Sequence, residues 1–102
     1  MNSKQYFDSL VQKIQVHLKS YDWQVVAMDD DTIQEEDLNY FICFFMSGKS
    51  VLKNTSERGK FLFNLFKAIE KKPPQRVRFE FWEDTAKGPI RHGGSVVSPD
   101  DI

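Results

Sequence analysis

The densest group of chemically active side chains is the acidic segment at residues 29–37. It carries six carboxylates in nine positions, namely Asp29, Asp30, Asp31, Glu35, Glu36 and Asp37. An EF-hand loop needs a central glycine and oxygen ligands at alternating positions, and this segment has neither, so we predict no metal site and no cofactor. A concentrated negative patch can attract a basic protein and speed its association. A solvated loop that keeps the sheet edges soluble is the simpler alternative.

A basic segment at residues 71–78 points to a second kind of chemistry. Its cations are Lys71, Lys72, Arg76 and Arg78. On a strand, Arg78 lies on the same face as Trp82, and this pairing of a cation with an aromatic ring could contact a phosphate and stack a base. The net charge of the whole chain is only -1, without the basic excess typical of nucleic-acid binders. Nucleic-acid binding is therefore the alternative function.

The remaining reactive side chains make a poor catalytic set. Cys43 is the only cysteine, and it lies between phenylalanines in an apolar run, where an inert core thiol is expected. His17 and His92 are the only histidines, and the sequence does not bring either close to a nucleophile. We therefore predict that the protein is not an enzyme.

The cysteine count and the hydropathy also bear on location. A single cysteine cannot form an intrachain disulfide, which is typical of a reducing compartment. The N-terminal residues lack the apolar core of a signal peptide, and no stretch approaches the length needed to cross a bilayer. These features predict a cytoplasmic protein without membrane contact.

Two helices are expected from apolar residues spaced three and four apart. The first covers residues 2–21 and has the stripe Phe7, Leu10, Val11, Ile14, Leu18 and Tyr21. The second begins near residue 54 and stops before two consecutive prolines, with Leu62, Leu65, Phe66 and Ile69 on its inner side. Each helix has one apolar face, so both should pack on the same sheet.

Three strands are expected at residues 23–28, 38–46 and 75–83, because β-branched and aromatic residues dominate there. The glycine-rich residues 86–94 indicate a loop, and a further short strand is expected around residues 96–97. The order α-β-β-α-β, with a possible last β, predicts an α+β two-layer sandwich. In it, two helices cover one face of an antiparallel sheet of three or four strands. We expect one domain at residues 1–98 and a frayed C-terminal tail at residues 99–102.

The run at residues 40–46, Tyr-Phe-Ile-Cys-Phe-Phe-Met, is apolar on both faces of its strand. A chain of 102 residues can cover one face of its sheet with helices but lacks the material to cover two. We expect Tyr40, Phe44 and Trp82 to share the face away from the helices and to form an exposed aromatic patch.

The acidic segment and this aromatic patch together predict a non-catalytic protein-binding module. The most plausible kind is a small inhibitor of the antitoxin or immunity type, from a bacterium or a phage. Its acidic segment would oppose a basic cleft of a toxin or nucleic-acid enzyme, and its sheet aromatics would anchor the contact. A homodimer formed through the sheet is compatible with this function.

Overall fold

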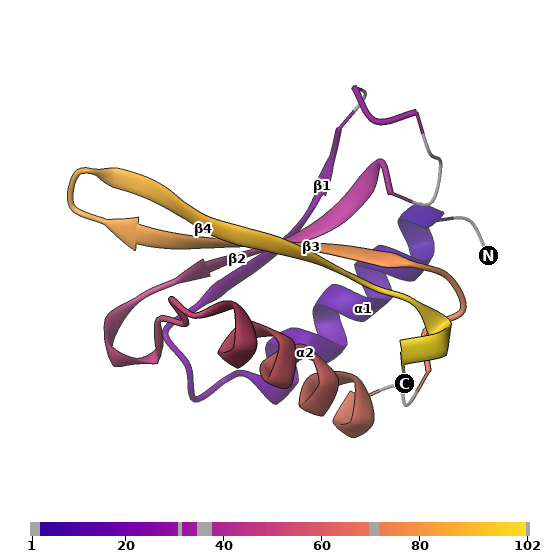
Figure 1. The fold of residues 1–102 in the computed structure, drawn as a ribbon, viewed down its shortest axis with the longest axis horizontal. Coiled ribbons are helices and arrows are strands. Elements are labelled where there is room, and N and C mark those ends of the chain that lie inside the picture. The colour runs from indigo at the N-terminus through magenta and orange to yellow at the C-terminus, as the bar shows by residue number, and fades with distance from the viewer. Residues whose placement is uncertain (1–2, 31, 35–37, 70–71, 102) are drawn as a thin grey trace.

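The structure is a computed structural model that describes residues 3–30, 32–34, 38–69 and 72–101 (Figure 1). Two α-helices and four strands follow one another in the order α-β-β-α-β-β, with two short 3-10 turns. They are α1 (Ser3–His17), β1 (Gln24–Asp29), β2 (Tyr40–Met46), η1 (Gly48–Ser50), α2 (Thr55–Ile69), β3 (Val77–Thr85), β4 (Gly88–Val97) and η2 (Pro99–Asp101).

The strands form one sheet in the order β1-β2-β3-β4, and both helices lie on the same side of it (Figure 1). This confirms the predicted α+β architecture with two layers. The sheet is mixed, however, because β2 and β3 run parallel while β1–β2 and β3–β4 are antiparallel. The parallel pair follows from α2, which carries the chain back along the sheet before β3 begins.

The helices bury most of the apolar stripes that their spacing predicts. The first helix is shorter than predicted, since α1 ends at His17, and Tyr21 beyond it is exposed. Phe7, Leu10 and Ile14 of α1 are at most 1% exposed, and Leu62, Leu65 and Phe66 of α2 at most 2%. Asn54 caps α2, since its side-chain oxygen accepts hydrogen bonds from the backbone N–H groups of residues 56 and 57 at 2.8 and 3.4 Å. The helix therefore begins at Thr55, next to the start predicted near residue 54.

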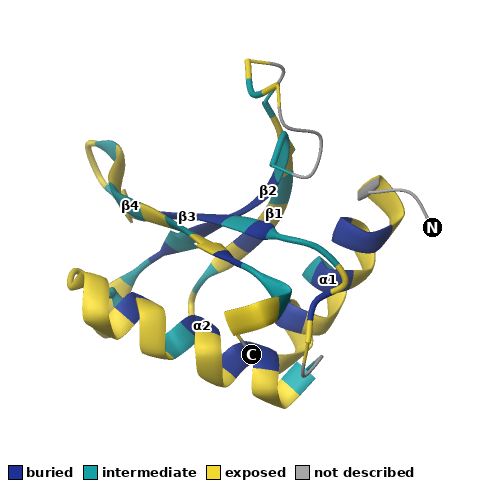
Figure 2. Ribbon diagram, turned by 45° about the vertical axis from the view of Figure 1, so that its right-hand side comes forward, coloured by how far each residue is buried: buried dark blue, intermediate teal, exposed yellow. Residues whose placement is uncertain are grey.

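The core between helices and sheet is largely aromatic. Phe44 is fully buried near its centre, with the rings of Phe79 and Phe81 stacked at centroid distances of 5.6 and 5.0 Å. Phe61 and Trp23 meet the same ring edge-on at 5.7 and 5.6 Å. Figure 2 shows the buried positions gathered where the helices face the sheet.

The prediction of a loop at residues 86–94 is wrong, because β4 runs from Gly88 to Val97. Its glycines let other groups approach the strand closely. A Cβ on Gly93 would lie 2.8 Å from Nη2 of Arg58, a buried residue of α2. A Cβ on Gly94 would lie 2.6 Å from Oε2 of Glu80 on the other face of the sheet. Glycine here therefore reflects tight packing on both faces.

The C-terminal segment, expected to be frayed, contains the turn η2. The backbone N–H of Ser98 donates to Oδ2 of Asp101 at 2.7 Å, and the N–H of Asp101 donates to the carbonyl of Ser98 at 2.9 Å. These two bonds close the turn that follows β4.

Candidate functional site

The face of the sheet away from α1 and α2, here called the open face, is the main candidate site. Residues that pair directly across strands share a face, so the register assigns its members. They are Gln24, Val26 and Met28 of β1, Phe41, Cys43 and Phe45 of β2, Arg78, Glu80 and Trp82 of β3, and on β4 they include Val96. In Figure 2 this face lies above the sheet, between the ends of the β1–β2 and β3–β4 pairs.

The two predicted aromatic positions on β2 lie on the opposite face, which corrects the sequence-based assignment. Phe44 is fully buried in the core, and Tyr40 packs against that core with its ring stacked on Phe7 at 6.1 Å. Trp82 does lie on the open face, where it is half-buried. The aromatic neighbours of Trp82 on β2 are therefore Phe41 and Phe45.

The chain itself shelters the middle of the open face. Phe41 and Cys43 are only 8% and 1% exposed although they point away from the helices. The guanidinium of Arg78 lies 4.2 Å from the centre of the Phe41 ring, a cation–π contact that covers it. The edge is less protected, since Val26 and Met28 are 39% and 42% exposed. The open face thus combines a sheltered centre with an exposed apolar margin.

A hollow of about 240 Å³ opens on this face. Its lining is mostly apolar, with one carboxylate, and consists of Met28, Phe41, Cys43, Phe45, Trp82, Pro89 and Glu80. Concave apolar surfaces with few polar groups are typical of sites that bind another molecule. This hollow is the part of the open face best shaped to receive a side chain of a partner.

An ion-paired cluster borders the hollow. Glu80 accepts two hydrogen bonds from Arg91, from Nε at 2.8 Å and from Nη2 at 3.0 Å, and Arg78 lies 3.7 Å from the same carboxylate. Its hydrogen bond with Arg91 is the main cause of a lowered pKa of Glu80, followed by the charge of that arginine and of Arg78. Glu80 is therefore a carboxylate held by two guanidinium groups.

Asp30 connects the acidic segment to this cluster. Its Oδ1 accepts hydrogen bonds from the backbone N–H and the hydroxyl of Thr32 at 3.1 and 2.6 Å, and its Oδ2 lies 3.5 Å from Nη1 of Arg78. These hydrogen bonds, and then the charge of Arg78, lower the pKa of Asp30. Asp30 thus has a structural role in addition to any role in binding.

The other predicted acidic residues divide into two groups. Asp29 is exposed at the end of β1. Asp31, Glu35, Glu36 and Asp37 lie outside the described residues. The part of the segment that is described adjoins the open face through the contact between Asp30 and Arg78.

The predicted nucleic-acid contacts do not converge in the described structure. Lys72 is exposed and Arg76 is half-buried, and both precede β3, while Lys71 lies outside the described residues. Arg78 faces the carboxylates of Asp30 and Glu80, so its charge is already balanced by two anions. This pairing weakens the case for a phosphate contact at Arg78.

Cys43 provides a direct test of the sheltered centre. Burial, and next the charge of Glu80, raise the pKa of this thiol to about 11. The thiolate is the reactive form, so alkylation by iodoacetamide at about pH 8 should be at least about 100-fold slower than for an exposed cysteine. The same reaction in urea serves as the control and should be fast, whereas rapid labelling of the folded protein would show that Cys43 is accessible.

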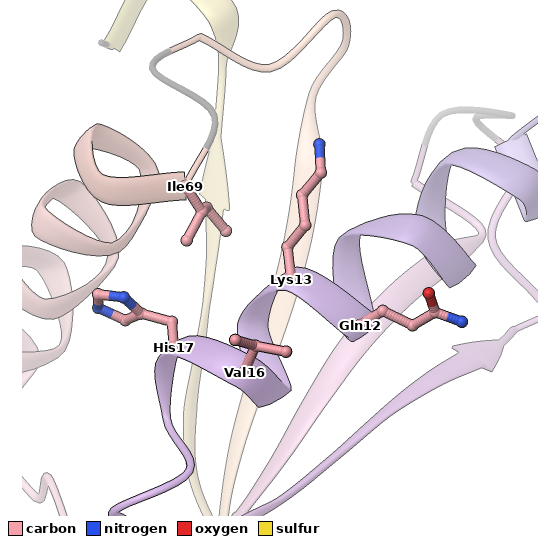
Figure 3. A pocket seen from close by; sticks show the side chains of 5 residues that line it. All are labelled: Gln12, Lys13, Val16, His17 and Ile69. Carbon is pink, nitrogen blue, oxygen red and sulfur yellow. The ribbon is translucent and has the colours of Figure 1, made fainter.

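A second hollow of about 460 Å³ lies where α1 and α2 end, but it lacks converging polar groups. Figure 3 shows its lining residues, Gln12, Lys13, Val16, His17 and Ile69, with Gln12 pointing away from the others. Within the described ranges, no three His, Cys, Asp or Glu side chains are grouped closely enough to hold a metal ion. The open face therefore remains the stronger candidate.

Sequence reasoning missed the open-face roles of Phe41, Phe45 and Arg91. Alternation separated the residues of β2 into two sets, but both sets are apolar, so periodicity could not tell which one faces the helices. Arg91 was assigned to a loop, and only the pairing of β3 with β4 brings it to Glu80. Knowledge of the strand register was the missing signal.

Comparisons of the chain with family models, with curated proteins and with solved structures found no match. Among the described residues, no helix has both the length and the apolar character that spanning a bilayer would require. Functional inference therefore depends on the surfaces of the molecule.

Proposed function

We propose that this protein is a non-catalytic protein-binding module that acts as a small inhibitor of the antitoxin or immunity type. The observation that carries the proposal is the apolar hollow on the open face, which the helices leave uncovered and which Trp82 borders. Trp is enriched among the residues that dominate binding energy at protein interfaces. The partner would place an apolar side chain in this hollow.

The acidic segment supplies the second half of the mechanism. It is continuous with β1, and Asp30 contacts the open face through Arg78. A basic partner surface would be steered by these carboxylates and then held by the apolar contact. Occlusion of a basic cleft, such as that of a toxin or a nucleic-acid enzyme, is the inhibitory act.

A non-catalytic role is consistent with the chemistry of the open face. The polar groups there, Arg78, Glu80 and Arg91, are paired with one another. The raised pKa of Cys43 keeps its thiol protonated near neutral pH, which is unsuitable for a nucleophile. These side chains are suited to shaping a surface.

Capture from the native host with open-face variants tests this proposal. The immobilised protein is compared with the double variant Met28→Ser and Trp82→Ser, and bound proteins are identified by mass spectrometry. The double variant should reduce capture of a specific partner by at least about tenfold, because it removes the side chains that the partner would cover. The control Val16→Ser removes an apolar side chain that is 71% exposed on α1 and should leave capture unchanged. Equal capture by all three proteins would refute the open face as the binding surface.

The role of the acidic segment is tested separately through salt dependence. Neutralising Asp29, Asp31, Glu35 and Glu36 as amides, while retaining Asp30 for its structural contacts, should weaken capture and flatten its dependence on salt. A control with the same change in charge replaces exposed carboxylates elsewhere, namely Asp22, Glu57, Asp84 and Asp100. If both sets weaken capture equally, only net charge matters. Capture of nucleic acid in place of a protein would favour the alternative function.

A further inference from the structure

The two edges of the sheet differ in their protection against pairing with another strand. The β4 edge contains Pro89, which has no backbone N–H, and its pairing with β3 shifts register between Phe81 and Trp82. Both features discourage the addition of a strand. The β1 edge, Gln24 to Asp29, has no proline, glycine or lysine and is apolar from Val25 to Met28. The β4 edge is therefore protected by its sequence and register, whereas the β1 edge lacks both of these devices.

Hydrogen-bond directions identify the backbone groups at the β1 edge. The N–H of Asp30 donates to the carbonyl of Asn39 at 2.7 Å, so this amide points toward β2. The backbone N–H and C=O groups of successive residues point alternately to the two sides of an antiparallel strand. Those of Val25, Ala27 and Asp29 therefore point to the outer edge. Gln15 of α1 supports this assignment, because its Nε2 donates to the carbonyl of Val25 from outside the sheet at 3.2 Å. A side-chain amide thus already occupies one acceptor that an added strand would use.

A groove of about 520 Å³ runs between α1 and this edge. Asp8, Val11, Gln12 and Gln15 line it from the helix, and residues 25–27 line it from the strand. Successive side chains of an added strand would point alternately into this groove and toward the open face. On the open face they would meet Val26 and Met28, which are 39% and 42% exposed. The edge thus offers backbone pairing together with contacts on both faces.

The charges at the edge select the kind of strand that fits. Asp8 is the charged residue among those that line the groove, and Asp29 is exposed where β1 ends. A second copy of this chain, paired through its own β1, offers these carboxylates no cation, because Gln24–Asp29 contains neither lysine nor arginine. An extended segment that carries Lys or Arg complements them.

We propose that β1 binds an extended segment of a partner protein by strand addition, and that this segment alternates apolar residues with Lys or Arg. This inference rests on the proposed function, because both require a protein partner, and it specifies how that partner binds. Main-chain hydrogen bonds would hold the segment, while the groove and the carboxylates would select its side chains.

Synthetic peptides of alternating Lys and Val, followed by amide NMR of the ¹⁵N-labelled protein, test the proposal. Binding should shift the amides of residues 24–29 and of the groove-lining part of α1. Only alternate N–H groups of an added strand face β1. A peptide N-methylated on every Val and a peptide N-methylated on every Lys should therefore differ in their affinity for the protein. One should lose about tenfold or more in affinity from its missing hydrogen bonds, and the other should not. Equal affinities, or a Kd weaker than about 1 mM for the unmodified peptide, would overturn the proposal.

Protein variants provide the second arm. Ala27→Pro removes an N–H that faces the outer edge and should abolish peptide binding, while circular dichroism checks that the variant folds. Asp8→Asn with Asp29→Asn should weaken binding several-fold and reduce its salt dependence, whereas Asp22→Asn with Asp84→Asn should not. A dimer in light scattering that Ala27→Pro dissociates would show that a second copy occupies the edge, and would overturn the proposal.

Failure of strand addition at β1 can be distinguished from failure of the proposed inhibitor function. A captured partner that is lost with the open-face variants but retained by Ala27→Pro would refute strand addition and leave the inhibitor proposal intact. A partner lost with Ala27→Pro but retained by Trp82→Ser would support strand addition and refute the open face. This comparison uses Trp82→Ser alone, because Met28 belongs to β1 and also lines the hollow on the open face.

Discussion

Replacing Phe44 by alanine should lower the free energy of unfolding by about 4 kcal/mol, the range typical of Phe→Ala changes in cores. The ring is fully buried, and four other rings surround it with centroid distances of 5.0 to 5.7 Å. Its removal leaves a cavity that fixed helices and strands cannot fill. Urea denaturation followed by circular dichroism measures the change.

Phe45→Ala is the matched control, because it removes the same ring from the next position of β2 on the open face. Phe45 is half-buried, so we expect a smaller loss of about 1 to 2 kcal/mol. A loss for Phe45→Ala that equals or exceeds the loss for Phe44→Ala would contradict the assignment of faces along β2.

Replacing Glu80 by glutamine should cost about 2 kcal/mol at neutral pH, because it breaks a pair whose carboxylate is largely buried. The value lies below the usual range for buried pairs because the side chain of Arg91 is 51% exposed, so solvent screens its half of the interaction. Urea denaturation again measures the change, and Asp84→Asn, at an exposed position of β3, is the control. Equal midpoints for wild type and the glutamine variant would show that the pair adds no stability.

The stability that the Glu80–Arg91 pair contributes should depend on pH. The pKa of Glu80 is lowered in the folded state. Its contribution to stability is therefore present above the unfolded-state pKa of about 4.3 and is lost as the pH falls through the folded-state pKa. The stability difference between wild type and Glu80→Gln should therefore be full at neutral pH and vanish in strong acid. A difference that persists undiminished at about pH 2 would contradict this linkage.

Strand addition explains why an unprotected edge lies next to an acidic segment. The carboxylates that would oppose aggregation between copies of this chain also favour a basic partner strand. The open face and the β1 edge share Val26 and Met28, so one partner could contact both. Variants that separate the two surfaces decide how much each contributes.

The local sequence pattern alone was sufficient to predict the helices and the fold class. The stripes Phe7–Leu10–Ile14 and Leu62–Leu65–Phe66 bury one face of each helix as predicted, and Asn54 caps the second helix. These features depend on residues a few positions apart, which the sequence displays directly. The double-sided apolar character of β2 was likewise evident before the fold was known.

Features that depend on contacts between distant residues were decided only by the tertiary structure. Which face of β2 meets the helices required the register with β3, because both faces are apolar. Gly93 and Gly94 belong to a strand because Arg58 and Glu80 pack closely against them on its two faces. The sequence does not show these neighbours, and two consecutive glycines by themselves indicate a loop. The open β1 edge and the ion pairs around Glu80 arise in the same way, because pairing and packing bring together residues that are far apart in sequence.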